Sequence, residues 1–222
     1  IGMAVAMLIG LWVFDELSFN RSFKNYSRLS NVYHHLTFGS DMFTESGVSA
    51  RFVYEARNNF PEFESLALTS YQSDHIVSFK ETKFSRPGLF VEPQFIEMFS
   101  LRMIHGTQDA LSSMHSVLVS KTLADLLPGE NPVGQVLRFD NRDDLMVTGV
   151  YEDFPANSEF SEIQMLMPME YYFSTSEPAR KQRDSWDDIS FQCFVLLSDR
   201  TSLLEAEAKI KSLLFEKGSA DM

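Results

Sequence analysis

The spacing of apolar residues along this chain of 222 residues alternates between the period of a strand and the period of a helix. Helical spacing, each time introduced by a serine that can cap a helix, occurs at residues 49–60, 120–127 and 202–214. Strand-like runs occur at residues 31–38, 63–79, 101–105, 116–119, 136–139, 145–151, 163–167 and 191–197. The order is β-α-β, a strand-rich middle, then β, loop and β-α, which predicts an α+β fold.

The order of these elements also predicts how the chain is divided. Residues 31–83 and 159–217 are expected to form one α+β lobe from both ends of the chain. Residues 84–158 are expected to form a second, strand-rich lobe inserted between them. The most polar stretch, residues 177–188, is the best candidate for a mobile loop. The buried face predicted for the last helix consists of Leu203, Ala206, Ile210, Leu213 and Leu214.

The first fourteen residues, IGMAVAMLIGLWVF, carry no charge. A transmembrane helix needs about 20 apolar residues, so we interpret residues 1–14 as the end of one, in a chain that is a piece of a longer protein. Asp15 and Glu16 would mark the point where this helix enters water. Residues 15–30 are expected to continue it as a stalk helix or to form a short separate helix. The alternative is that residues 1–14 form an ordinary helix buried in a protein core.

The amino-acid composition limits the classes of molecule that this chain can bind. The net charge of −12 and the pI of about 4.8 describe an acidic surface, which repels phosphate backbones and anionic lipid headgroups. Nucleic acid is therefore excluded as a partner class. A hydrophobic content of 44% with 20 phenylalanines is ample for a core. The single cysteine, Cys193, rules out an internal disulfide and any cysteine-based zinc site.

Motifs for nucleotide binding, nucleophilic catalysis and metal binding are incomplete. Residues 129–134, GENPVG, have glycines spaced as in a phosphate loop but continue with Gln135, and the proline removes an amide, so a tight turn is predicted. Ser49 lacks the second small residue of a nucleophile elbow and is better explained as a helix cap. No pair of histidines has the i, i+4 spacing of a helical metal site, the five being His34, His35, His75, His105 and His115.

Three further groups of residues have a structural and a functional interpretation. Asp140, Asp143 and Asp144 lack the register of a calcium loop and are predicted to lie in a solvated turn. Cys193 lies in an alternating strand and is interpreted as a small buried apolar residue rather than a reactive thiol. Methionines recur at every second position, at Met165, Met167 and Met169. They are interpreted as core residues, with a soft apolar cleft between the lobes as the functional alternative.

Several motifs follow one another in a fixed order along the chain, and each is similar to a segment of one family of membrane-protein domains. Residues 14–21, FDELSFNR, resemble the exit of the first membrane helix in that family, and Asn25 with Arg28-Leu29 resembles the segment before its first strand. The further motifs are residues 90–95 (FVEPQF) with 99–101 and Gly106, residues 117–120 (VLVS), residues 131–134 (NPVG), residues 147–150 (VTGV) and residues 153–158 (DFPANS). Together these motifs resemble the extracytoplasmic domain of MacB/FtsX-like ABC-transporter permeases, the MacB-like periplasmic core domain. Pro128 and Gln135 depart from the pattern of that family, which leaves the subfamily undefined.

The resemblance implies a Porter-like lobe built from both chain ends and an inserted Sabre-like lobe, standing on the first membrane helix. It implies no catalytic residue, cofactor or metal, because a separate cytoplasmic ATPase drives such permeases. ATP-driven motion would reach the domain through the stalk. The implied function is this mechanotransmission, used to export or extract a substrate. The implied partners are that ATPase, a second permease copy, and a periplasmic adaptor, outer-membrane or lipoprotein partner. The implied place is the bacterial inner membrane, with this domain facing the periplasm or the cell exterior.

A second class of function remains open at this point. A membrane-anchored sensor domain would bind a small ligand between the two lobes, and it would require a well-formed pocket with convergent polar groups. A hydrolase has no motif in its support. The substrate and the outer partner are not fixed by any residue pattern.

Overall fold

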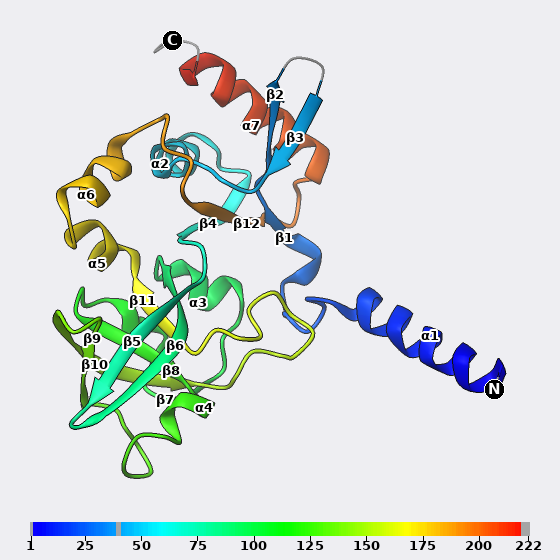
Figure 1. The fold of residues 1–222 in the computed structure, drawn as a ribbon. Helices are drawn as coiled ribbons and strands as arrows, with labels where there is room; N and C mark the ends of the chain where they lie inside the picture. The colour runs from blue at the N-terminus through cyan, green and yellow to red at the C-terminus, as the bar shows by residue number, and fades with distance from the viewer. Residues whose placement is uncertain (1, 39–40, 219–222) are drawn as a thin grey trace.

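The computed structural model describes residues 2–38 and 41–218, with side chains described for residues 2–35 and 41–213. The helices are α1 Gly2–Ser18, α2 Ala50–Asn59, α3 Gln94–Met98, α4 Lys121–Ala124, α5 Met169–Ser174, α6 Glu177–Asp184 and α7 Leu203–Gly218, with short 3-10 turns at Tyr26–Arg28 and Gln108–Leu111. The strands are β1 Leu29–Asn31, β2 His34–Phe38, β3 Asp41–Glu45, β4 Phe63–Thr69, β5 Ser73–Phe79, β6 Thr82–Val91, β7 Met103–His105, β8 Ser116–Ser120, β9 Val136–Phe139, β10 Asp143–Tyr151, β11 Met165–Pro168 and β12 Gln192–Leu197. The mixed α+β fold predicted from the sequence is confirmed (Figure 1).

Apart from β2 and β3, which pair only with each other, the described strands form one continuous sheet with two different parts. In the first part β12 pairs antiparallel with both β1 and β4, so strands from the two ends of the chain lie side by side. The second part is a closed ring in which the neighbours are β6, β11, β8, β10, β9 and β5, and β5 pairs back onto β6. A single pair, Thr69 with Val91, joins the two parts through β4 and β6. Closure of the ring satisfies the backbone groups that open edge strands would expose.

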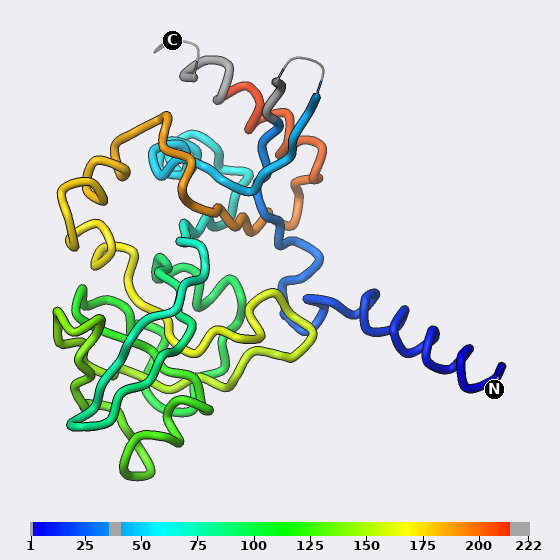
Figure 2. Tube along the Cα trace, viewed as in Figure 1, coloured from blue at the N-terminus to red at the C-terminus, as the bar shows by residue number. Residues whose placement is uncertain are grey.

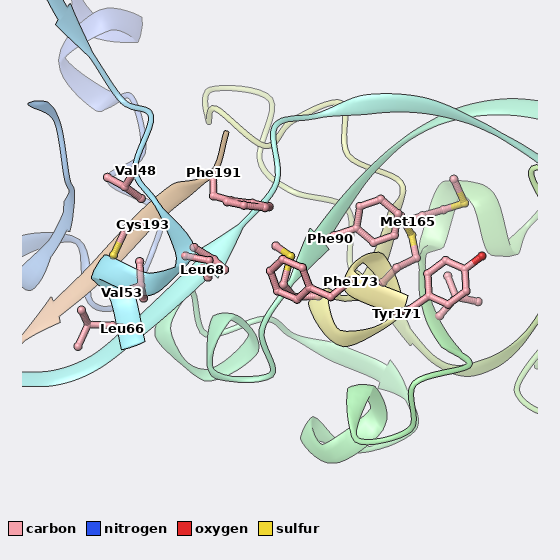
Figure 3. Close-up of a cluster of buried hydrophobic side chains, with 14 of the residues drawn as sticks. Val48, Val53, Leu66, Leu68, Phe90, Met165, Tyr171, Phe173, Phe191 and Cys193 are labelled. Carbon is pink, nitrogen blue, oxygen red and sulfur yellow. The ribbon is translucent and has the colours of Figure 1, made fainter. Parts of the chain in front are cut away.

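The core runs without interruption from the first part of the sheet into the ring. Figure 3 shows Val53, Leu68 and Cys193 at one end of this core and Phe90, Met165 and Tyr171 at the other. Met165 and Met167 are fully buried, which agrees with their interpretation as core residues. A second cluster lies on the other side of the sheet and combines six phenylalanines with a larger number of mainly aliphatic residues.

Helix caps predicted from the sequence are present. The hydroxyl of Ser49 accepts a hydrogen bond from the Phe52 amide (3.1 Å), and that of Ser120 accepts one from the Leu123 amide (3.3 Å). Ser202 and Glu205 form the capping box at the start of α7. On α7, Ala206 and Leu213 are buried as predicted and Ile210 packs against the core. Leu203 is 61% exposed, so its assignment to the buried face was wrong, and Leu214 lies outside the described side chains.

Several local predictions are corrected by the structure. The stalk helix expected over residues 15–30 ends at Ser18, because Asn20 adopts a left-handed conformation (φ 60°) that breaks the helix. The expected mobile loop at residues 177–188 begins with helix α6, which is capped by the Ser176 hydroxyl. The strand predicted at residues 31–38 is split into β1 and β2, and β2 pairs with β3 in a separate hairpin.

The predicted division of the chain remains a proposal, and strand pairing favours different limits. β5 pairs with β6 and β9, and β11 pairs with β6 and β8, so both belong to the ring. We therefore propose that the inserted lobe begins near residue 70, ahead of the predicted residue 84, and extends through β11 beyond residue 158. The other lobe then consists of β1, β4, β12, α2 and α7.

Candidate functional site

Helix α1 stands apart from the rest of the chain (Figures 1 and 2). It has no buried residue, and its large apolar side chains are exposed on all sides, Met3 by 75% and Phe14 by 70%. A helix that is apolar all round is stable only when protein or lipid covers it. In the part of the chain that the structure describes, no helix is long and apolar enough to cross a membrane.

The end of α1 is held by a loop that lies 139 positions later in the sequence. The side-chain amide of Asn157 donates to the hydroxyl of Ser18 (2.9 Å) and to its carbonyl oxygen (3.3 Å). The backbone amide of Asn20 donates to the backbone carbonyl of Asn157 (3.0 Å), and the backbone amide of Glu159 donates to the side-chain oxygen Oδ1 of Asn20 (3.1 Å). Four hydrogen bonds therefore link the exit of α1 to residues 157–159, and we call this set of contacts the junction.

An aromatic cluster lies directly behind the junction. Its members are Phe23, Phe95, Phe99, Phe154, Phe160 and Phe194. The ring of Phe23 lies 5.1 Å from that of Phe99 and 6.1 Å from that of Phe160, both edge-on. The side-chain amide of Asn25 adds a hydrogen bond to the Met98 carbonyl (3.0 Å). Edge-to-face pairs and burial make this cluster a rigid anchor for the segment that follows α1.

The loop that holds α1 is itself fixed at both ends. The hydroxyl of Ser158 donates to the Pro155 carbonyl (2.7 Å), and that of Tyr151 donates to the Ile163 carbonyl (3.0 Å). Burial raises the pKa of Tyr151 well above its usual value, so this hydroxyl keeps its proton. The carboxylate of Asp153 accepts from the Thr122 amide at the start of α4 (3.1 Å). The loop that contacts α1 is therefore tied to β10 through Tyr151 and to the start of α4 through Asp153.

The junction was not predicted, although Ser18, Asn20 and Asn157 lie in two of the motifs that carry the family resemblance. Residues 14–21 and residues 153–158 were identified as separate segments, and the structure brings them together. Their spacing along the chain gives no indication of contact. Asn20 and Asn157 are residue types that favour turns and local hydrogen bonds, which was the only local signal.

A second feature is a cleft of about 470 Å³, lined by α2, α5, α6 and the turn between β6 and α3. We call it the α2–α6 cleft. Its polar side chains include Tyr54 and Arg57 of α2, Glu92 of the turn and Arg183 of α6, and its apolar ones include Met169 and Phe173. Of the three methionines at period two, only Met169 reaches this cleft, so the apolar cleft considered as their functional alternative applies to Met169 alone.

An ion pair between Arg57 and Glu92 forms one wall of this cleft. The Glu92 carboxylate also accepts the Leu68 amide (2.9 Å), and Arg57 also donates to the Leu66 carbonyl (3.0 Å). The Glu92 side chain is only 12% exposed. The pair therefore connects α2 and β4 to the turn that follows β6 of the ring.

Of the histidines and acidic residues singled out in the sequence, only His75 and Asp140 come together. Nδ1 of His75 lies 2.9 Å from Oδ2 of Asp140, and its Nε2 lies 2.9 Å from the Ser73 hydroxyl. This chain of contacts has the order of a Ser-His-Asp triad, but none of the three residues lines the α2–α6 cleft. Its evident role is to tie β5 to the turn between β9 and β10, since Asp140 also accepts the Ile76 amide (2.9 Å).

The remaining candidates have structural roles in the part of the chain that is described. Burial raises the pKa of the Cys193 thiol, which is fully buried and therefore a poor nucleophile. Gly129 and Gly134 both have φ of 89° and flank a turn that Gln135 closes by donating to the Pro128 carbonyl (2.7 Å). Within the described residues, no group of three or more His, Cys, Asp or Glu side chains is placed to hold a metal ion.

Three solved structures share this fold. The first is a domain described as belonging to a permease protein from Porphyromonas gingivalis, with a TM-score of 0.70 and 23% identity over 87% of this chain and 86% of that one. The second is the periplasmic region of MacB from Actinobacillus actinomycetemcomitans, with a TM-score of 0.64 and 16% identity over 90% of this chain and 87% of that one. The third is the extracellular domain of the ABC-type transporter YknZ from Gram-positive bacteria, with a TM-score of 0.58 and 11% identity over 86% of this chain and 95% of that one. A search of curated protein sequences gives no match.

The shared fold is the one seen in the extracellular and periplasmic domains of ABC-type transporters. Residues 1–213 match the model of the MacB-like periplasmic core domain, and the chain belongs to this family. The resemblance recognised in the sequence is thereby confirmed. Membership places the domain on the periplasmic or extracellular side of a membrane transporter and implies an ATPase partner and dimerization of the permease.

Proposed function

We propose that this domain transmits ATP-driven motion of a permease to partners outside the membrane. Helix α1 carries the motion, the junction passes it to residues 157–159, and the loop passes it to the ring. The observation that carries this proposal is the double hydrogen bond from Asn157 to Ser18, which sits at the one point where an exposed apolar helix meets the folded body. The apolar part of α1 is then the end of a membrane helix.

Hydrogen bonding and aromatic packing support a rigid link. Four hydrogen bonds and a buried phenylalanine cluster meet within a few residues of the end of α1. Each hydrogen bond is worth about 0.5–1.5 kcal/mol, so together they hold the helix direction against thermal motion. The proposed partners are an ATPase subunit, a second copy of the permease, and an adaptor, outer-membrane or lipoprotein partner outside the membrane. The domain itself performs no chemistry in this account.

The sensor function is supported by a specific observation, the α2–α6 cleft with its convergent arginines and tyrosine. A ligand there would contact α2 on one side and the turn after β6 on the other. Binding and force transmission are compatible, because the cleft and the junction share no residue.

Replacing Asn157 with alanine in the full-length permease is expected to uncouple the domain. The two side-chain hydrogen bonds to Ser18 are lost, which weakens the junction by about 1–3 kcal/mol and lowers transport-coupled ATP turnover by about tenfold. The measurement is ATP turnover of the permease purified in mild detergent together with its ATPase subunit, identified by mass spectrometry. Circular dichroism would show that the variant is folded.

Asn59→Ala is the matched control, since Asn59 makes its hydrogen bonds within α2, far from the junction, and its loss should leave turnover unchanged. Equal turnover in Asn157→Ala and the wild type would contradict the proposal. If no ATPase co-purifies and a signalling protein does, the sensor function replaces it.

A further inference from the structure

The α2–α6 cleft has a chemical character that the coupling function does not require. Two guanidinium groups and one phenol converge on it, from Arg57, Arg183 and Tyr54. The Arg183 guanidinium lies 5.9 Å from the ring centre of Tyr54 and 5.7 Å from that of Phe173, so it spans two aromatic faces. The cleft therefore combines the hydrogen-bond donors of these three residues with the apolar side chains of Met169 and Phe173.

The two carboxylates in this cleft, those of Glu92 and Glu170, differ in burial and in the number of their hydrogen-bond donors. Glu92 is largely buried and held by Arg57 and the Leu68 amide. Glu170 pairs with Arg183 at 3.1 Å, but 60% of its side chain and 41% of that of Arg183 are exposed. An exposed ion pair of this kind contributes little to stability and exchanges readily. Arg183 is thus the cation that an incoming anion can take over.

Tyr54 completes the set of donors. Burial, followed by the neighbouring Glu92 carboxylate, raises the pKa of Tyr54 to about 12, against the opposing effect of both arginines. Its hydroxyl therefore keeps its proton at neutral pH and is available to donate a hydrogen bond to an anion. No hydrogen bond occupies this hydroxyl within the described residues, which leaves it free for a ligand.

The apolar side of the cleft is preformed. Met169, Phe173 and Leu111 are each 2% exposed and form its floor, while Met114 is 37% exposed at its edge. A volume of about 470 Å³ falls within the range of small-ligand sites, roughly 300–1,000 Å³. Aromatic and methionine side chains accept apolar groups of varied shape.

We propose that the α2–α6 cleft binds a carboxylate that carries an apolar substituent. The carboxylate displaces Glu170 from Arg183, forms a bidentate pair with the guanidinium and accepts the Tyr54 hydroxyl, while the apolar group lies on Met169 and Phe173. Two sources share this chemistry, the carboxyl end of a peptide with an apolar last residue and a fatty acid. The proposal does not depend on force transmission, because the junction can fail while the cleft still binds.

The test uses the chain in mild detergent with ¹³C-methyl-labelled methionine, so that the methyl signals of Met114 and Met169 report binding at this place. The probes are the tripeptide Ala-Ala-Phe with a free carboxyl group, the same peptide as its amide, and octanoate. The free acid is expected to shift both signals, and the amide to bind about tenfold more weakly. A shift with octanoate at lower concentration than with the peptide would identify the acyl source of the same chemistry.

Two substitutions with opposite expected effects sharpen the test. Arg183→Gln should weaken binding of the free acid about tenfold or more, whereas Glu170→Gln should tighten it several-fold because it frees Arg183. Arg200→Gln removes an exposed cation elsewhere and should change nothing. Equal binding of acid and amide, no shift of either methyl signal up to about 10 mM of any probe, or weaker binding in Glu170→Gln would overturn the proposal.

Discussion

Replacing Phe160 with alanine is expected to lower the free energy of unfolding by about 3–5 kcal/mol, one of the two largest effects of a single substitution in this domain. The ring of Phe160 lies within 4.9–6.1 Å of five other phenylalanine rings, on α3, β12, its own loop and the segment after α1. Truncation leaves a cavity among side chains from all of these elements. Chemical denaturation followed by circular dichroism would measure the loss.

Tyr33→Ala is the matched control for Phe160→Ala. It also removes an aromatic ring, but Tyr33 is 56% exposed, so a change of about 0.5 kcal/mol or less is expected. A loss for Phe160→Ala as small as that of the control would show that the aromatic cluster does not anchor the segment after α1.

The second large effect is expected at the ion pair between α2 and the turn after β6. Glu92→Ala removes the carboxylate that neutralises Arg57 and the acceptor of the Leu68 amide, while Arg57 keeps only the Leu66 carbonyl, which should cost about 3–5 kcal/mol. Glu92→Gln keeps an acceptor for the Leu68 amide and should cost less. Both are measured by the same denaturation experiment.

Glu97→Ala is the control for charge, since Glu97 is exposed on α3 and its loss should be nearly neutral. In a double-mutant cycle, Arg57→Leu combined with Glu92→Leu should cost less than the sum of the two single changes. Additive costs would mean that the two side chains do not interact as the structure indicates.

The sequence predicted those elements whose signals are local. Ser49, Ser120 and Ser202 cap helices at the expected positions because a helix N-terminus is specified within four residues. The same local signal was present before α6, where Ser176 is followed by glutamate and Pro178, a residue favoured in the first turn of a helix. The polarity of that stretch suggested a loop, although its Glu177–Lys181 pair supports a helix.

Elements that depend on distant contacts were less predictable. Strand β6 contains Pro87 and Gly88, two residue types that are disfavoured inside strands. In the ring the Pro87 carbonyl accepts the Gln164 amide (2.9 Å), and a side chain at Gly88 would lie 3.0 Å from both His75 and Met167. The ring therefore contains, in the middle of a strand, residues that a local pattern associates with turns. The same holds for the junction and the cleft, whose residues come from segments far apart in the sequence.

The junction is the central claim, and a cross-link tests it most directly. Cysteines at Ser18 and Asn157 would form a disulfide across the contact that now joins the two side chains at 2.9 Å, and the buried Cys193 would not interfere. ATP turnover and transport by the full-length permease are then compared before and after oxidation. Before oxidation the double variant lacks the Asn157 hydrogen bonds, so its turnover should be lowered as in Asn157→Ala. A rigid junction predicts that oxidation restores both activities, because the cross-link fixes a contact that stays closed throughout the cycle. Loss of activity on oxidation and its recovery on reduction would contradict the account, since the junction would then have to open.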